Sequence, residues 1–146
     1  MNKKRIRQCI DMLNAIDERH FSMTRFQKVT GANCVQWDME HFHACGNSAC
    51  FAGYLALSDF FRNDGGDIDI DSGAPVFENQ MGSLAVSKYL GISTLASLLL
   101  VNGDVDELYN EGQDRWRCYS NYYEKEWQDV TPKDVVKKLE GILQRG

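Results

Sequence analysis

The chain has 146 residues, of which 43% are hydrophobic and 11% aromatic, and it carries a net charge of −5. This composition is typical of a globular protein and excludes a largely disordered chain. No apolar run approaches the roughly 20 residues that cross a membrane as a helix. The acidic balance disfavours nucleic acid as a partner, because Lys and Arg contacts to phosphate supply most non-specific affinity for DNA.

Length and cysteine content indicate one domain in a reducing compartment. A chain of this size can bury about two thirds of its unfolded surface around one core, so we expect residues 1–146 to form a single domain. Acidic residues interrupt the basic N-terminus before any apolar signal core, and five cysteines without such a signal indicate free thiols or metal ligands rather than disulfides. We therefore expect a cytoplasmic protein, with its oligomeric state left open.

The first half of the chain predicts two helices separated by an irregular segment. Apolar residues at helical spacing predict an amphipathic helix over residues 3–19. Residues 20–47 lack a period, and we expect their aromatic rings to pack onto the domain. Asn47 or Ser48 is then a suitable N-cap for a helix over 49–61, which is apolar on nearly all sides and therefore central and buried. Its small residues, which would let another segment approach its backbone, are Ala49, Ala52, Gly53 and Ala56.

The second half predicts a hairpin and three further helices. Alternating polar and apolar residues predict a short β-hairpin near residues 68–77. Gly91 separates a helix over 83–90 from one over 93–102, and Thr131 begins a C-terminal helix. We expect a mainly α fold with about five helices around the central buried helix, together with the short β-hairpin.

A ten-residue cluster holds two of the three histidines and two of the five cysteines. His41, His43 and Cys45 point to one face if this stretch is extended, and Cys50 supplies a possible fourth ligand. Nitrogen and sulfur donors of this kind bind zinc in tetrahedral geometry. The alternative is a packed corner without metal, because free cysteine is among the most buried residue types.

The same cluster permits a thiol-dependent site. Cys50 is expected in the first turn of a helix, where backbone N–H groups stabilise a thiolate. However, all three histidines precede it, whereas papain-like enzymes supply their histidine after the cysteine. We therefore assign no catalytic residues and keep thiol chemistry at Cys50 as an alternative.

Residues 86–97 imitate the helix-turn-helix motif of DNA-binding regulators. A recognition helix presents Arg, Lys, Asn or Gln to base edges, but residues 93–101 read STLASLLLV. Acidic residues follow at positions 104, 106 and 107, and they would repel phosphate. We therefore interpret this segment as two core helices joined by a glycine, with DNA binding as a third hypothesis.

Aromatic and charged residues between 113 and 127 form a candidate contact surface. Trp, Tyr and Arg are enriched at protein interfaces, and they also stack on nucleobases. The alternative is that these rings cover the helical core while the neighbouring charges stay in water. The candidate binding residues are Arg115, Trp116, Arg117, Tyr119, Tyr122, Tyr123 and Trp127.

Several segments together resemble a family of small uncharacterised proteins of bacteriophages and bacteria. They are Phe21-Ser22-Met23, the region of Trp37, CGNSACFAGYLAL at 45–57, KYLGIS at 88–93 and TPKDVVKKLEGI at 131–142. The family is marked by a Cys-Gly-Thr-x-Ala-Cys-x-Ala-Gly box, in which Asn47 here replaces the threonine. The resemblance implies a small, largely helical protein of phage or prophage origin in the host cytoplasm, with no catalytic residues to carry over.

The sequence favours a non-enzymatic binding protein. No complete set of acid, base and nucleophile is evident, and aromatic residues stand beside charges in segments 21–43 and 113–127. Small phage proteins of this kind often inhibit a host defence protein or sequester a small nucleotide-like signalling ligand, and we expect one of these two roles. A zinc or thiol site at 41–50 is the second hypothesis.

Overall fold

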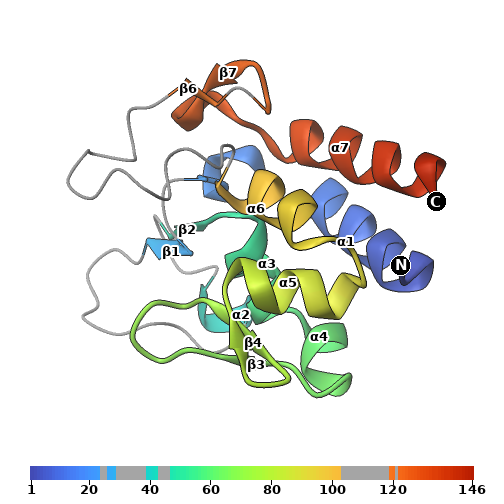
Figure 1. Ribbon diagram of the computed structural model, residues 1–146. Coiled ribbons are helices and arrows are strands. Elements are labelled where there is room, and N and C mark those ends of the chain that lie inside the picture. Colours follow the sequence, from blue (N-terminus) through green and yellow to red (C-terminus); the bar gives the residue numbers. More distant parts are fainter. Residues whose placement is uncertain (24–25, 29–38, 43–46, 103–118, 121) are drawn as a thin grey trace.

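The computed structural model describes residues 1–23, 26–28, 39–42, 47–102, 119–120 and 122–146 (Figure 1). Its α-helices are α1 (Lys3–Ala15), α2 (Met39–Phe42), α3 (Phe51–Leu57), α4 (Asp59–Asn63), α5 (Ser83–Leu90), α6 (Thr94–Asn102) and α7 (Pro132–Arg145). Its strands and 3-10 helices are η1 (Glu18–His20), β1 (Gln27–Lys28), β2 (Ser48–Ala49), β3 (Asp67–Ile68), β4 (Pro75–Phe77), β5 (Gln80–Met81), β6 (Tyr119–Ser120), β7 (Lys125–Glu126) and η4 (Trp127–Asp129). The predicted mainly α fold with a short antiparallel hairpin is confirmed.

Helix α3 is the buried centre of the fold, as its apolar sequence predicts. All seven of its residues are buried. It is shorter than the predicted helix over 49–61, because Ser58 is extended and its hydroxyl donates to the Leu55 carbonyl at 2.7 Å. Since this hydroxyl competes for the helix carbonyls, the chain begins a separate helix, α4, at the next residue.

Helix α1 also ends earlier than predicted, at Ala15. Ile16 is extended, and the side chain of Asp17 accepts the backbone N–H of Arg19 to begin the short helix η1. An aspartate that caps a new turn is favoured over one inside a helix. The apolar period therefore continues past the point where the backbone leaves the helix.

The other predicted helix ends are confirmed by their capping groups. Gly91 has a φ of 63° in the left-handed region, where it ends α5. The Ser93 hydroxyl accepts the Ala96 N–H at 3.1 Å before α6. Thr131 and Asp134 form a reciprocal capping box at the start of α7.

The predicted hairpin is the β3–β4 pair, and β5 adds a third antiparallel strand. Glu78 and Asn79 connect β4 to β5 with φ angles of 47° and 62°. Two consecutive positive φ angles suit the right-handed twist of a tight hairpin. This third strand is not predicted from the sequence, because glutamate is not one of the residues that are typical of such a turn.

The helices pack in pairs around α3 (Figure 1). Helix α1 packs against α7, and α5 packs against α6. Met1 and Gly146 lie close together, so the two ends of the chain share one end of the molecule (Figure 1). This arrangement places α5 and α6 at the surface, with the start of α1 beside the end of α5.

Candidate functional site

The box around Cys50 forms a tightly packed corner before α3. Cys50 is the N-cap of α3, which corrects its predicted place inside the first turn, and its sulfur accepts the Gly53 N–H at 3.4 Å. Asn47 donates from Nδ2 to the Phe42 carbonyl at 2.8 Å. Both side chains are buried, so in the structure this part of the box shapes the entry to the central helix.

The environment of Cys50 opposes thiolate formation. Its exposed fraction is 3%, and burial raises the pKa of the thiol to about 11, although hydrogen bonds from Gly53 and Ala52 lower it. A nucleophilic cysteine instead needs an accessible, electropositive surrounding that lowers the pKa. In this structure Cys50 therefore remains a protonated capping group.

The zinc hypothesis depends largely on residues outside the described part of the chain. His43 and Cys45 lie outside it, and of His41 only the backbone in α2 is described. Among the described residues, no three His, Cys, Asp or Glu side chains are grouped so that they could hold a metal ion. Zinc binding at the four predicted ligands thus stays a prediction, which metal analysis of protein purified without a histidine tag would test.

The candidate surface between 113 and 127 is partly core. Tyr123 and Trp127 are 6% and 5% exposed, and the Tyr123 hydroxyl donates to the Leu100 carbonyl at 2.7 Å. Burial raises the pKa of Tyr123 well above its ordinary value. Tyr123 thus holds the segment against α6, and Trp127 packs beside Tyr123. Both rings were predicted as contact residues, but in the described structure both are buried.

The remaining candidates of this surface are placed only in part. Tyr122 is half-buried, and the Lys138 Nζ lies 4.5 Å from the centre of its ring. Tyr119 belongs to β6, but its side chain lies outside the described part of the structure. Arg115, Trp116 and Arg117 also lie outside the described residues.

Helices α5 and α6 pack as two helices joined at Gly91, in agreement with the sequence interpretation. Ser97 of α6 is buried and donates to the Ser83 carbonyl at the start of α5. On its outer side α6 exposes Leu95, whereas a recognition helix would expose polar donors for base edges. The structure therefore offers no support for DNA readout by α6.

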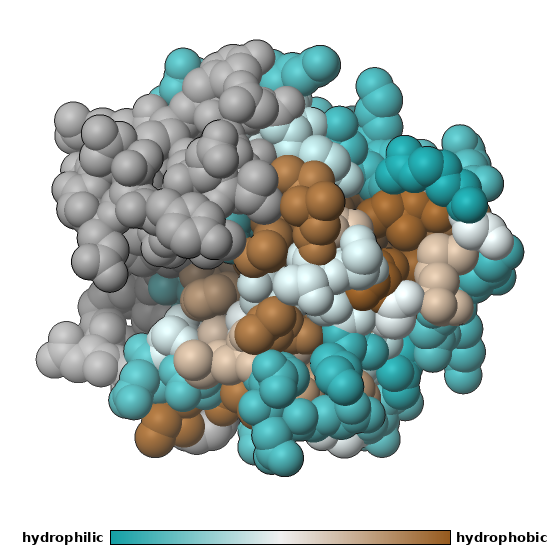
Figure 2. Space-filling model, viewed as in Figure 1, coloured by the Kyte–Doolittle hydropathy of each residue, from teal (hydrophilic) through white to brown (hydrophobic). Residues whose placement is uncertain are grey.

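The outer side of these two helices is a surface that we call the leucine face. Leu84 is 44% exposed and Leu95 is 55% exposed, and Leu98 and Leu99 are half-buried beside them. Figure 2 shows hydrophobic residues gathered over α5 and α6 near the centre of the visible surface. Met81 of β5 is 55% exposed near the start of α5. This face is not among the predicted contact surfaces, because α5 and α6 are predicted as core helices.

A charge pattern in the sequence marks the leucine face. Residues 83–102, which span both helices, contain one charged residue, Lys88, and no acidic residue. In a chain with a net charge of −5, a surface helix without charges is unusual, since exposed helix faces are normally polar. This lack of charge is the signal in the sequence that could have indicated an apolar outer side of α6.

A basic groove of about 630 Å³ lies beside the leucine face. Its charged side chains come from two helices distant in sequence: Lys3 and Arg5 from α1, and Lys88 from α5. The other lining residues are Met1, Asn2, Tyr89 and Gly91. None of the seven is acidic, so the groove favours a negatively charged group.

Arg5 is fixed in this groove by three interactions. Its Nε donates to the Asp64 carboxylate at 3.0 Å, and its Nη1 donates to the Tyr89 carbonyl at 3.0 Å. Its guanidinium lies 4.3 Å from the centre of the Tyr89 ring. The hydrogen bond from the Tyr89 hydroxyl, followed by that from Arg5, holds the pKa of Asp64 below its ordinary value. Arg5 thus links α1 to Asp64 and to Tyr89 of α5 and forms a fixed wall of the groove. Lys3 and Lys88 remain exposed to solvent.

We compared the chain with protein families, curated proteins and solved structures. No family model, curated protein or solved structure matches the chain, and the family resemblance stays a prediction. Within the described residues, no helix combines the length and apolar character that a membrane crossing requires.

Proposed function

We propose that this protein is a non-enzymatic binding protein that covers an amphipathic helical segment of another protein with its leucine face. The single observation that carries this proposal is the 55% exposure of Leu95 in a helix without charged residues. Complete burial of a fully exposed leucine contributes about 1.5–3 kcal/mol, and Leu95, which is 55% exposed, leaves roughly half of this free energy unused. A partner that covers the face would recover this free energy.

The leucine face has the form that suits a helical partner. Two packed helices, α5 and α6, expose Leu84, Leu95 and the half-buried Leu98 along their outer side. Amphipathic helices dock on such faces through apolar side chains spaced three and four residues apart. Covering the exposed parts of these leucines supplies a few kcal/mol, and burial of the partner's own apolar side chains adds a similar amount, so the ~8 kcal/mol of a micromolar complex requires both sides of the contact.

Charge favours a different protein over a second copy of this chain. Two copies both carry a net charge of −5, which disfavours their approach. In a twofold symmetric pair the same patch faces itself, and residues 83–102 contain no acidic residue that could pair with Lys88 of the other copy. A helix with acidic residues beside its apolar side meets neither obstacle.

The resemblance to small phage proteins is the reason to propose a host protein as the partner. The leucine face is the surface through which we propose that the protein acts. An accessory protein that covers a helix of a host protein prevents that helix from meeting its usual partner. We therefore propose inhibition of a host protein, such as a defence protein, rather than chemistry on a substrate.

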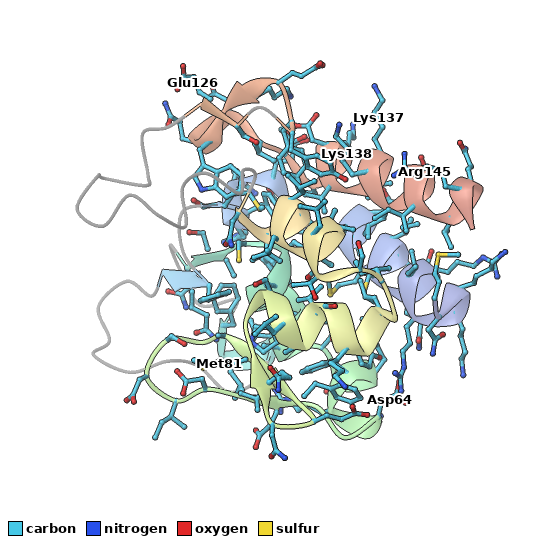
Figure 3. All side chains as sticks on the ribbon, in the orientation of Figure 1. Asp64, Met81, Glu126, Lys137, Lys138 and Arg145 are labelled. Atoms are coloured by element: carbon cyan, nitrogen blue, oxygen red, sulfur yellow. The ribbon has the colours of Figure 1, made fainter. Side chains whose placement is uncertain are left out.

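Photo-crosslinking at position 95 tests this proposal. A photoreactive phenylalanine replaces Leu95 in one variant and Lys137 of α7 in the control, and both are expressed in a bacterial host. Lys137 is exposed at the upper edge of the molecule in Figure 3, on a different helix. We expect position 95, and not 137, to crosslink to a host protein within a helix that has leucines at helical spacing. Crosslinks only to a second copy, or equal crosslinking at both positions, would contradict the proposal.

A further inference from the structure

We infer that the basic groove beside the leucine face binds the carboxylates of acidic residues at one end of the partner helix. This inference rests on the proposed function and names the chemistry of the partner. It follows from the lining of the groove, the exposure of its lysines and its continuity with the leucine face.

The lysines of the groove are available to a partner. Lys88 has a side chain that is 58% exposed, and its contact with Glu78 is long, at 3.8 Å. Lys3 is exposed, and Arg5 is held in place by Asp64 and Tyr89. A weak surface ion pair contributes little free energy, so exchanging Glu78 for a carboxylate of a partner costs little.

The groove and the leucine face lie along one row of α5. Leu84 and Lys88 are four residues apart and both exposed, so they occupy the same side of the helix. Gly91 then leads into the groove, where Lys3 of α1 adds a second exposed ammonium group. A helix that lies along this row of α5 over Leu84 therefore extends its end toward two lysines.

This juxtaposition predicts an acidic helix end rather than a phosphate-rich ligand. The groove is continuous with an apolar face, which a nucleotide or inorganic phosphate would leave uncovered. Carboxylates of Asp and Glu on an amphipathic helix can instead form surface ion pairs with these lysines while its apolar side covers the leucines. The pairs would add selectivity and speed of association more than affinity, because they stay close to solvent.

Two synthetic helical peptides test the inference with the intact chain. Each has 18 residues with leucines at helical spacing, and the last turn carries either three glutamates or three glutamines. We expect the glutamate peptide to bind about tenfold more tightly at low salt, since each exposed pair contributes a few tenths to 1 kcal/mol. The difference should shrink in 1 M salt, where the Debye length falls to about 3 Å.

A charge-reversal pair provides the matched control. Lys3→Glu with Lys88→Glu should remove the preference for glutamate, whereas Lys133→Glu with Lys137→Glu should keep it. Both double variants change the net charge equally, and Lys133 and Lys137 lie in the N-terminal half of α7, away from the groove at its C-terminal end. Thermal unfolding of both variants should match the wild type, because all four lysines are exposed.

The possible outcomes separate the groove from the proposed function. Equal binding of both peptides that is lost in Leu95→Asp overturns the groove inference and leaves the leucine face intact. Binding of neither peptide overturns the proposed function. Displacement of the glutamate peptide by millimolar ATP, with no loss in Leu95→Asp, would identify the groove as a nucleotide site and overturn the inference.

Discussion

The carbonyl oxygen of Phe26 lies directly against the backbone of Gly53, where a Cβ atom would be 1.7 Å away. The same Cβ would be 3.1 Å from the Ala49 Cβ. This close approach confirms the prediction that the small residues of the central helix let another segment reach its backbone. It explains the glycine of the box physically, because a side chain there would collide with backbone rather than with a movable side chain.

Replacing Gly53 by alanine should therefore destabilise the protein. Overpacking of a tight site costs about 1–3 kcal/mol or more, because Phe26 or α3 must shift. Gly141→Ala is the control, since the new Cβ there would lie 3.8 Å from the Arg145 Nη1, an ordinary van der Waals distance. In the helix α7 this change should stabilise the protein by about 0.5–1 kcal/mol. Urea unfolding measures both, and equal effects of the two substitutions would contradict the close approach.

The buried Cys50 thiol should make stability fall at alkaline pH. The pKa of the thiol is about 11 in the folded protein against an ordinary 9.0, so the unfolded chain releases this proton first. Stability from this group is complete below pH 9 and is lost as pH rises toward about 11, at no more than about 1.4 kcal/mol per pH unit.

Cys50→Ser isolates this contribution. Serine is a preferred N-cap, so α3 keeps its capping group without an ionisable thiol. The buried Cys9, whose pKa burial also raises, is present in both proteins and cancels in the comparison. Denaturant unfolding between pH 8 and 11 should give a flatter pH dependence for the variant. Parallel curves for the two proteins would show that Cys50 ionises freely.

The Tyr89 hydroxyl should set the acidity of Asp64. It donates to the Asp64 carboxylate at 2.9 Å and is the main cause of the lowered pKa of that group. Tyr89→Phe keeps the ring beneath Arg5 but removes this bond, so the pKa of Asp64 should rise toward 3.8. Asp69, whose pKa is lowered by Ser72, serves as the unchanged control in a carboxyl carbon NMR titration.

Loss of the Tyr89 hydrogen bond to Asp64 should also change how the stability of the protein depends on pH. A carboxylate with a lowered pKa stabilises the folded state above its unfolded pKa, and that stability is lost as pH falls through the folded value. Below about pH 4 the wild type should therefore lose more stability than Tyr89→Phe. An unchanged Asp64 titration in the variant would mean that Arg5 alone holds the carboxylate.

Two leucines of α6 should differ sharply in their contribution to folding. Leu100 is fully buried, so Leu100→Ala should cost about 2–5 kcal/mol. Leu95 is 55% exposed, and Leu95→Ala should change stability by no more than about 0.5 kcal/mol. Thermal and urea unfolding compare the two. A similar cost at both positions would show that Leu95 is covered in the free protein, which would contradict an available leucine face.

Local capping explains why parts of the fold could be predicted from the sequence. Gly91, Ser93 and Thr131 each act on backbone groups within a few residues, so the ends that they fix are readable without the rest of the fold. The apolar character of α3 likewise indicates its burial directly.

The unpredicted features arise either from competing local patterns or from contacts between residues far apart in sequence. At Ser58 and after Ala15 a side-chain hydrogen bond ends the helix, although the spacing of apolar residues continues. The apolar spacing alone does not show where such a bond replaces the helical one. Tyr123 is buried in the core, where its hydroxyl donates to the Leu100 carbonyl of α6, 23 residues earlier in the chain. The exposure of Leu95 likewise depends on which elements pack against α6. An apolar helix is expected in the core, so its exposed side becomes visible only once the neighbours of α6 are placed.

The proposed function requires that the leucine face bind a helical segment of another protein. The most direct measurement is the affinity of the wild type and of Leu95→Asp for a synthetic peptide of the segment that crosslinks at position 95, with Lys137→Asp as control. Because the aspartate is exposed, both variants should fold like the wild type in circular dichroism. We predict micromolar or tighter binding by the wild type and by Lys137→Asp, and at least about a tenfold loss in Leu95→Asp, since an uncovered leucine contributes more than 1.4 kcal/mol. Equal affinity of all three proteins would contradict the account.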